Sequence, residues 1–118
     1  MLFRSTLAHV GLDADDASVY EHAYARYQHH YGQINGQYSE VFPGVAEGLK
    51  MLSERQLPLA CLTNKPTAFA EALLQAKGLR PHFRHVFGGD AFARKKPDPL
   101  PLLKTCEALG CEIGRAHV

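Results

Sequence analysis

The first third of the chain carries apolar residues at helical spacing. Leu2, Leu7 and Val10 form part of one apolar stripe. A second series follows after a polar break, and aromatic side chains accompany it. Its members at helical spacing are Val19, Ala23, Tyr27 and Tyr31, with Tyr20 and Tyr24 beside them. The pattern predicts that residues 1–36 are mainly helical.

The break between these two series is the acidic segment at residues 11–18, GLDADDAS. Carboxylate and hydroxyl side chains accept hydrogen bonds from the free N–H groups at a helix start, and negative charge favours the positive end of the helix dipole. We therefore expect Asp15, Asp16 or Ser18 to cap the second helix. The pattern leaves these three candidates open.

The hydrophobic period changes beyond residue 40. Residues 41–45, VFPGV, mark a boundary because proline keeps the preceding residue extended and glycine relaxes the turn. Val45, Leu49 and Leu52 then fall on one face of a predicted helix. Residues 57–62, LPLACL, form an apolar run without polar alternation, which is typical of a strand covered on both faces in a parallel sheet.

The rest of the chain alternates in the same way. Pro66 suits the first turn of a third helix, for which Gly78 is a stop signal. Residues 85–87, HVF, form a second short strand candidate, and a last helix runs through Leu102 and Leu109. Helices alternating with short apolar strands predict an α/β fold with a parallel, Rossmann-like sheet.

The composition narrows the class of protein. Of the 118 residues 46% are apolar and 21% charged, and the net charge is +1, so nothing indicates a nucleic-acid surface. The apolar runs are far shorter than the ~20 residues that cross a bilayer, and the first residues do not resemble a signal peptide. Three cysteines without metal-like spacing are interpreted as reduced thiols. We expect a cytoplasmic protein with no membrane partner.

Candidate chemistry follows the two predicted strands. Thr63 and Asn64 end the first strand, and the pair Lys95 and Lys96 follows the second. Ligands of open parallel sheets gather beyond the carboxyl ends of the strands, where hydroxyl, N–H and ammonium groups suit phosphate oxygens. Taken singly, Thr63 could be a turn former and the lysine pair a solvated loop.

Together these segments resemble the phosphatases of the haloacid dehalogenase superfamily. Residues 62–66, LTNKP, look like the second motif of that superfamily, and residues 95–99, KKPDP, look like the third, in which the lysine before proline is catalytic. Residues 42–45, FPGV, resemble the return from a helical cap to the core, and residues 88–90, GGD, match a frequent spacer. The pattern is similar to that of phosphoglycolate phosphatases and close relatives.

The resemblance implies roles for individual residues. Thr63 would donate to a phosphoryl oxygen, and Lys96 would neutralise phosphoryl charge; both would be catalytic. Asn64 and Lys65 would bind substrate, Lys65 nearer the rim. The family implies an aspartate nucleophile that forms an aspartyl phosphate, a second aspartate as acid and base, and Mg²⁺. The partner would be a small phosphorylated metabolite; the oligomeric state stays open.

Two motifs of the family have no counterpart in the sequence. The nucleophile motif, Asp-x-Asp-Gly-Thr, is absent, because the similar stretch at residues 13–18 follows no apolar strand and has Asp16 in place of glycine. The acidic fourth motif beyond Leu109 is also absent, and residues 112–118 read like a translated sequencing adapter, a non-native tail. We therefore predict no metal ligands within this chain, although the full-length enzyme would use Mg²⁺.

The resulting hypothesis is a fragment with three parts. Residues 1–40 would be a partial helical cap, residues 41–111 a partial Rossmann-like phosphatase core, and residues 112–118 the tail. The parent would be a Mg²⁺-dependent phosphomonoester hydrolase with 2-phosphoglycolate as leading substrate. A phosphosugar phosphatase, such as one acting on N-acetylmuramate 6-phosphate, is an alternative, as is a catalytically inert fragment.

Overall fold

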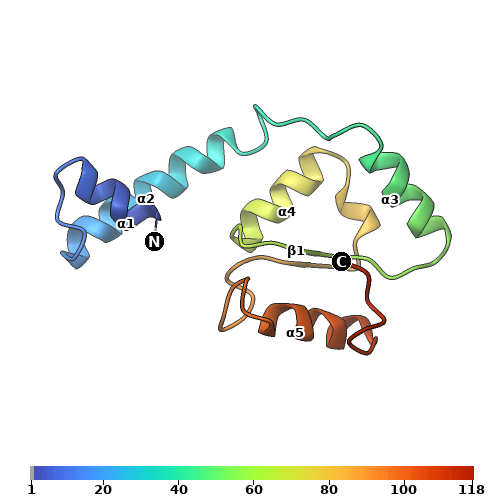
Figure 1. The fold of residues 1–118 in the computed structure, drawn as a ribbon. Helices are drawn as coiled ribbons and strands as arrows, with labels where there is room; N and C mark the ends of the chain where they lie inside the picture. The colour runs from blue at the N-terminus through green and yellow to red at the C-terminus, as the bar shows by residue number, and fades with distance from the viewer. Residues whose placement is uncertain (1) are drawn as a thin grey trace. The chain divides into compact units, whose positions relative to one another are not determined.

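The computed structural model describes residues 2–118, and these form two compact units. The first unit ends at Asn35, and the second runs from Gly36 to Val118. Each unit is a folded body in its own right (Figure 1). The elements in chain order are α1 (Leu2–His9), α2 (Ala17–Ile34), α3 (Val45–Glu54), β1 (Ala60–Leu62), α4 (Thr67–Ala76), the 3₁₀-helix η1 (Arg80–His82), β2 (His85–Phe87) and α5 (Leu100–Leu109).

The first unit is a pair of helices joined by aromatic packing. The ring of Phe3 on α1 lies 5.4–5.5 Å, centroid to centroid, from the rings of Tyr20, Tyr24 and Tyr27 on α2. Such edge-on and tilted pairs add to the free energy gained by burial. Leu7 is the one buried apolar side chain of α1 among those described. The two helices predicted for this region are confirmed.

The acidic segment forms the start of α2. The Asp16 carboxylate accepts hydrogen bonds from the backbone N–H groups of Ser18 and Val19, at 2.9 and 3.3 Å, and from the Ser18 hydroxyl at 2.7 Å. These bonds favour the ionised form and lower the pKa of Asp16, the hydroxyl bond contributing most. Of the three capping candidates, Asp16 is therefore the N-cap.

The second unit contains a parallel sheet covered on both faces. β1 and β2 pair in parallel, with Ala60 opposite His85 and Leu62 opposite Phe87. α4 packs on one side of the two strands and α5 on the other (Figure 1). Val86 at the centre of β2 is buried. The α/β class and the parallel sheet are confirmed.

Two element boundaries differ from the prediction. β1 starts at Ala60 rather than at residue 57, because Leu57 is 50% exposed and Pro58 has no N–H to contribute to a ladder. Pro66 is extended (φ −52°, ψ 139°) and stands at the N-cap of α4, so the helix begins at Thr67. Pro66 is thus outside the first helical turn.

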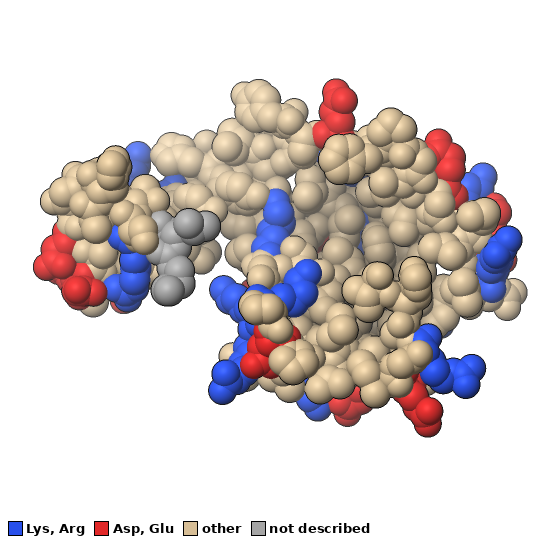
Figure 2. All heavy atoms as spheres, in the orientation of Figure 1, with Lys and Arg blue, Asp and Glu red and all other residues tan. Residues whose placement is uncertain are grey.

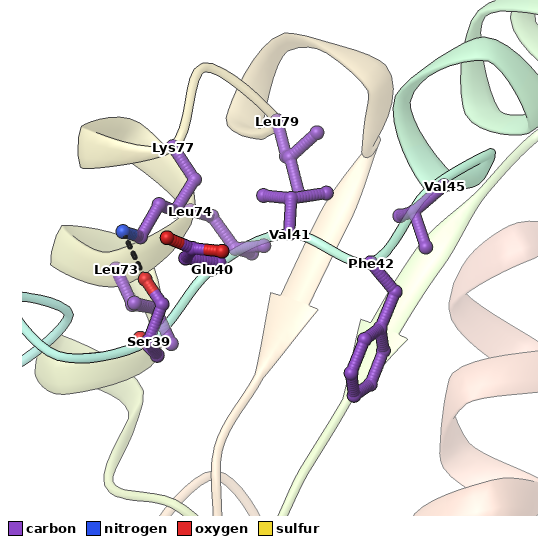
Figure 3. A pocket seen from close by; sticks show the side chains of 9 residues that line it. All are labelled: Ser39, Glu40, Val41, Phe42, Val45, Leu73, Leu74, Lys77 and Leu79. Carbon is purple, nitrogen blue, oxygen red and sulfur yellow. Dashed lines mark hydrogen bonds between the residues drawn. The ribbon is translucent and has the colours of Figure 1, made fainter.

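The segment after Gly36 packs along α4. Gly36 has φ +82°, and a Cβ there would lie 2.7 Å from the Leu73 side chain, so the chain passes close to the helix. The Lys77 ammonium donates to the Ser39 carbonyl oxygen (Figure 3). Val41 lines the shallow apolar hollow that results. This contact ties the entry of the second unit to α4.

Residues 2–118 include no helix that is both long enough and apolar enough to span a bilayer.

Candidate active site

Three loops of the second unit meet beyond the carboxyl ends of the two strands. Residues 63–67 follow β1, residues 88–90 follow β2, and residues 95–98 lie on the connection from β2 to α5. Hydrogen bonds join each loop to at least one of the others. The sequence brings these segments to one edge because parallel strands end at the same side of a sheet.

The first two loops touch through their backbones. The Thr63 N–H donates to the Phe87 carbonyl oxygen at 3.0 Å, and the Gly89 N–H donates to the Lys65 carbonyl oxygen at 2.9 Å. Gly88 and Gly89 are buried. A Cβ on Gly89 would lie 2.4 Å from the Asn64 carbonyl oxygen, and one on Gly88 would lie 2.2 Å from the Thr67 nitrogen. Only residues without a side chain allow this approach.

Asp90 and Thr67 complete the junction. The Asp90 carboxylate accepts from the Thr67 N–H at 2.8 Å and from the Thr67 hydroxyl at 2.5 Å, while the Thr67 hydroxyl oxygen accepts from the Gly88 N–H at 3.0 Å. The two bonds from Thr67, the hydroxyl bond first, lower the pKa of Asp90. The carboxylate caps α4 from another loop, which explains why extended Pro66 can precede the helix.

This pair was not predicted from the sequence. Asp90 appeared there only as part of the spacer at residues 88–90, and Thr67 was not considered. A capping side chain is usually sought next to the helix it caps, whereas Asp90 lies 23 residues beyond Thr67. The glycine pair directly after a short apolar strand was the available signal for a close backbone approach.

Thr63 stands at the end of β1 and is half-buried. Its hydroxyl oxygen accepts a hydrogen bond from the Lys65 N–H at 3.1 Å. That bond uses a lone pair of the oxygen, so the O–H group keeps its capacity as a donor. The same turn holds the backbone of Lys65, whose carbonyl accepts from Gly89.

Lys96 reaches the same strand end from the third loop. Its ammonium group donates to the carbonyl oxygen of Leu62 at 3.2 Å, one residue before Thr63. The Asn64 side chain is hydrogen-bonded to the backbone of Lys96 at both its N–H and its C=O, at 3.0 and 2.9 Å. Residues 32 to 34 positions apart along the chain thus meet at one rim.

The rim is basic. Arg94, Lys95 and Lys96 are consecutive and exposed, and Figure 2 shows lysine and arginine side chains gathered over the connection from β2 to α5. The Arg94 guanidinium is 3.6 Å from the Asp98 carboxylate. Positive charge concentrated beside a strand end favours an anionic ligand.

Neither a thiol nucleophile nor a metal cluster accompanies this rim. Burial raises the pKa of Cys61 within β1, so that group stays a neutral thiol. Residues 2–118 contain no group of three or more His, Cys, Asp or Glu side chains arranged to hold a metal ion. Asp90 is engaged by Thr67, and Asp98 accepts from the Leu100 N–H at 2.9 Å. The side chains of residues 2–118 therefore show no arrangement that would hold Mg²⁺.

The sheet, the covering helices and the rim define an α/β domain whose strand ends suit an anionic ligand. The family model of haloacid dehalogenase-like hydrolases matches residues 3–118, so the chain belongs to that family.

Individual relatives of the chain carry narrower descriptions than the family does. The chain is 42% identical over 100 residues to a phosphoglycolate phosphatase of Thiobacillus denitrificans, covering 84% of this chain and 44% of the relative. It is 39% identical over 97 residues to a phosphoglycolate phosphatase of Chromobacterium violaceum, covering 82% and 44%. The crystal structure of a predicted phosphoglycolate phosphatase from Haemophilus somnus superposes with a TM-score of 0.78 at 26% identity, covering 89% of this chain and 46% of that one. The chain spans less than half the length of these relatives.

Proposed function

We propose that this chain is part of a phosphatase that hydrolyses a small phosphomonoester, with 2-phosphoglycolate as the leading substrate. The observation that carries the proposal is the bond of the Lys96 ammonium to the Leu62 carbonyl oxygen at 3.2 Å. That bond sets a cation at the strand end, at the carbonyl group directly before Thr63. The choice of substrate is supported by relatives 42% and 39% identical, both phosphoglycolate phosphatases.

Thr63 and Lys96 would act on the charge of the phosphoryl group. A transferring phosphoryl group spreads negative charge over its oxygens, and donors fixed in advance stabilise that charge without reorganising. The Thr63 hydroxyl donates to one oxygen, and the Lys96 ammonium neutralises a second. Lys65 contacts the substrate from the rim, where its backbone is held by Gly89 and Thr63.

The bond-breaking step follows the family chemistry. An aspartate carboxylate from outside this chain forms a bond to phosphorus while the bond from phosphorus to the substrate oxygen breaks. A second aspartate gives the leaving alcohol its proton, and then takes one from the water that hydrolyses the aspartyl phosphate. The whole protein is proposed to require Mg²⁺, for which the residues described here supply no site. The 118 residues alone are therefore proposed to be inactive.

The test compares the 118-residue chain with a longer form that includes the flanking coding sequence. The short chain should show no hydrolysis of 2-phosphoglycolate in the presence of Mg²⁺, and the longer form should turn it over. Turnover by the short chain would contradict its proposed inactivity. A folded longer form without activity towards 2-phosphoglycolate and other small phosphomonoesters would overturn the phosphatase proposal.

Substitutions in the longer form test the residues. Lys96→Ala should lower kcat/KM by roughly 10³-fold, and Thr63→Ala by about 10²-fold, because each removes a donor to developing charge. Lys104→Ala removes an exposed lysine of α5 outside the rim and is the control, with an expected change below about threefold. A loss below tenfold for Lys96→Ala would remove Lys96 from the reaction.

A further inference from the structure

We propose that Asn64 is a positioning residue: its side-chain amide fixes the backbone of Lys96 to the end of β1 and thereby sets the direction of the Lys96 ammonium group. The inference deepens the proposed function and rests on it for the role of Lys96. It replaces the expectation that the Asn64 side chain binds substrate directly.

The Asn64 side chain forms two hydrogen bonds with the backbone of a single residue, Lys96. The side-chain oxygen accepts from the Lys96 N–H at 3.0 Å, and the side-chain nitrogen donates to the Lys96 carbonyl oxygen at 2.9 Å. A reversed amide would set N–H against N–H and oxygen against oxygen, so the two bonds define its orientation. Of the other side chains, only the longer amide of glutamine offers the same donor and acceptor pair.

Asn64 is itself held firmly. Its carbonyl oxygen lies where the missing Cβ of Gly89 leaves room, and the flanking residues are bonded to β2 and to Gly89. The neighbouring Thr63 N–H donates to Phe87, which continues the pairing of the strands. The amide therefore projects from a part of the backbone that is fixed to the sheet.

The loop that carries Lys96 has a different character. Among the described contacts, three further bonds of this loop are local: the Asp98 N–H donates to the Lys95 carbonyl oxygen at 3.0 Å, the Leu100 N–H donates to the Asp98 carboxylate at 2.9 Å, and Arg94 pairs with Asp98 at 3.6 Å. These contacts shape the loop without attaching it to the strand end. The attachments to the strand end are the Asn64 amide and the Lys96 ammonium bond to Leu62.

The consequence is that Asn64 acts through Lys96. If the backbone of Lys96 were not attached to the strand end, its long side chain would sample many positions. Small displacements of a catalytic group lower the rate by large factors. With its backbone fixed at two points, Lys96 has fewer positions in which its ammonium group can lie. Removal of the Asn64 amide should therefore harm only what Lys96 does.

Amide hydrogen exchange on the 118-residue chain tests the attachment without any assay of activity. In Asn64→Ala the Lys96 N–H loses its acceptor and should exchange at least about fivefold faster, a factor set by the strength of one hydrogen bond. Asn64→Asp keeps the acceptor, so exchange at Lys96 should stay within about threefold of the unsubstituted chain. Gln75→Ala, which removes an exposed amide from α4, should leave Lys96 unchanged. The Gly89 and Leu100 N–H groups, which have other acceptors, report whether the variants keep the fold. Equal exchange at Lys96 in all forms would overturn the inference.

A double-mutant cycle on the longer form tests the route of action. Asn64→Ala should lower kcat/KM by about 10- to 100-fold when Lys96 is present, and by less than about threefold in a Lys96→Ala background. An equal loss in both backgrounds would show that Asn64 contacts substrate itself and would overturn the inference, while the proposed phosphatase would stand. If the longer form lacks phosphatase activity, the proposed function fails, and the exchange experiment alone decides whether Asn64 holds the loop.

Discussion

The two loops that carry Thr63 and Lys96 are held in place in opposite ways. The loop at residues 63–67 is fixed by its backbone, which bonds to Phe87 and Gly89 and packs against two glycines without side chains between them. The loop at residues 95–98 is attached to the same strand end through side chains, the Asn64 amide and the Lys96 ammonium group.

The difference indicates which part of the rim is formed by folding itself. Backbone bonds that continue the pairing of β1 and β2 arise whenever the sheet forms, so the Thr63 hydroxyl is placed with the sheet. The Lys96 loop depends on single side chains, each of which contributes about 1 kcal/mol. Changes that disturb the backbone packing of the first loop should therefore affect stability, and loss of the side-chain attachments of the second loop should affect chiefly activity.

The largest expected change in stability comes from closing the space at Gly89. In Gly89→Ala the new Cβ would lie 2.4 Å from the Asn64 carbonyl oxygen, and a backbone atom cannot turn aside as a side chain can. We expect the free energy of unfolding to fall by about 2–4 kcal/mol, measured by urea denaturation.

Gly48→Ala is the matched control for that substitution. Gly48 lies in α3, and a Cβ there meets nothing within 4 Å. It should raise stability by about 0.5–1 kcal/mol, because alanine favours a helix over glycine. A Gly89→Ala protein as stable as the unsubstituted chain would show that the two loops are not packed at this point.

A smaller effect is expected from the hydroxyl of Thr67. Thr67→Val keeps the shape of the side chain and the N–H bond to Asp90 but removes the two bonds of the hydroxyl, to Asp90 and from Gly88, and it should cost about 1–2 kcal/mol. Thr67→Ser retains the hydroxyl and loses one methyl group. Its cost in stability should exceed that of losing the methyl group by less than about 0.5 kcal/mol. The measurement is the thermal midpoint of each variant. Equal midpoints for Thr67→Val and Thr67→Ser would show that the hydroxyl does not stabilise the contact between the loops.

The smallest expected effect is the pH dependence of the stability that Asp90 contributes. The pKa of Asp90 is lowered in the folded chain by the bonds from Thr67, so its contribution is present above the unfolded value of about 3.9. It is lost as the pH falls through the folded value. The thermal midpoint of the unsubstituted chain should therefore exceed that of Asp90→Asn at pH 6, and the gap should shrink at pH 3. If the difference in thermal midpoint were the same at pH 6 and pH 3, the charge of Asp90 would not contribute, and the backbone bonds alone would hold the two loops together.

Much of the site follows from local pattern, and the rest from contacts at long range. Thr63 and Lys96 were singled out because each lies within a recognisable segment, LTNKP or KKPDP. The roles of Asp90 and Thr67 were not found, since their bonds cross 23 residues and resemble no local motif. Asn64 was recognised as a site residue, but its partner, the Lys96 backbone, is visible only when the loops are placed together.

The sequence by itself determined the alternation of helices with short apolar strands, the capping of α2 by an acidic residue, and the place of each motif in the segment that follows a strand. These properties depend on side chains acting within a few residues of their own backbone. Tertiary structure decided that the Lys96 ammonium group lies at the Leu62 carbonyl, that Asp90 caps a distant helix, and that the Asn64 amide engages a loop 32 residues away. Such contacts form because parallel strands bring their ends to one edge, and the spacing along the chain does not specify which side chains then meet.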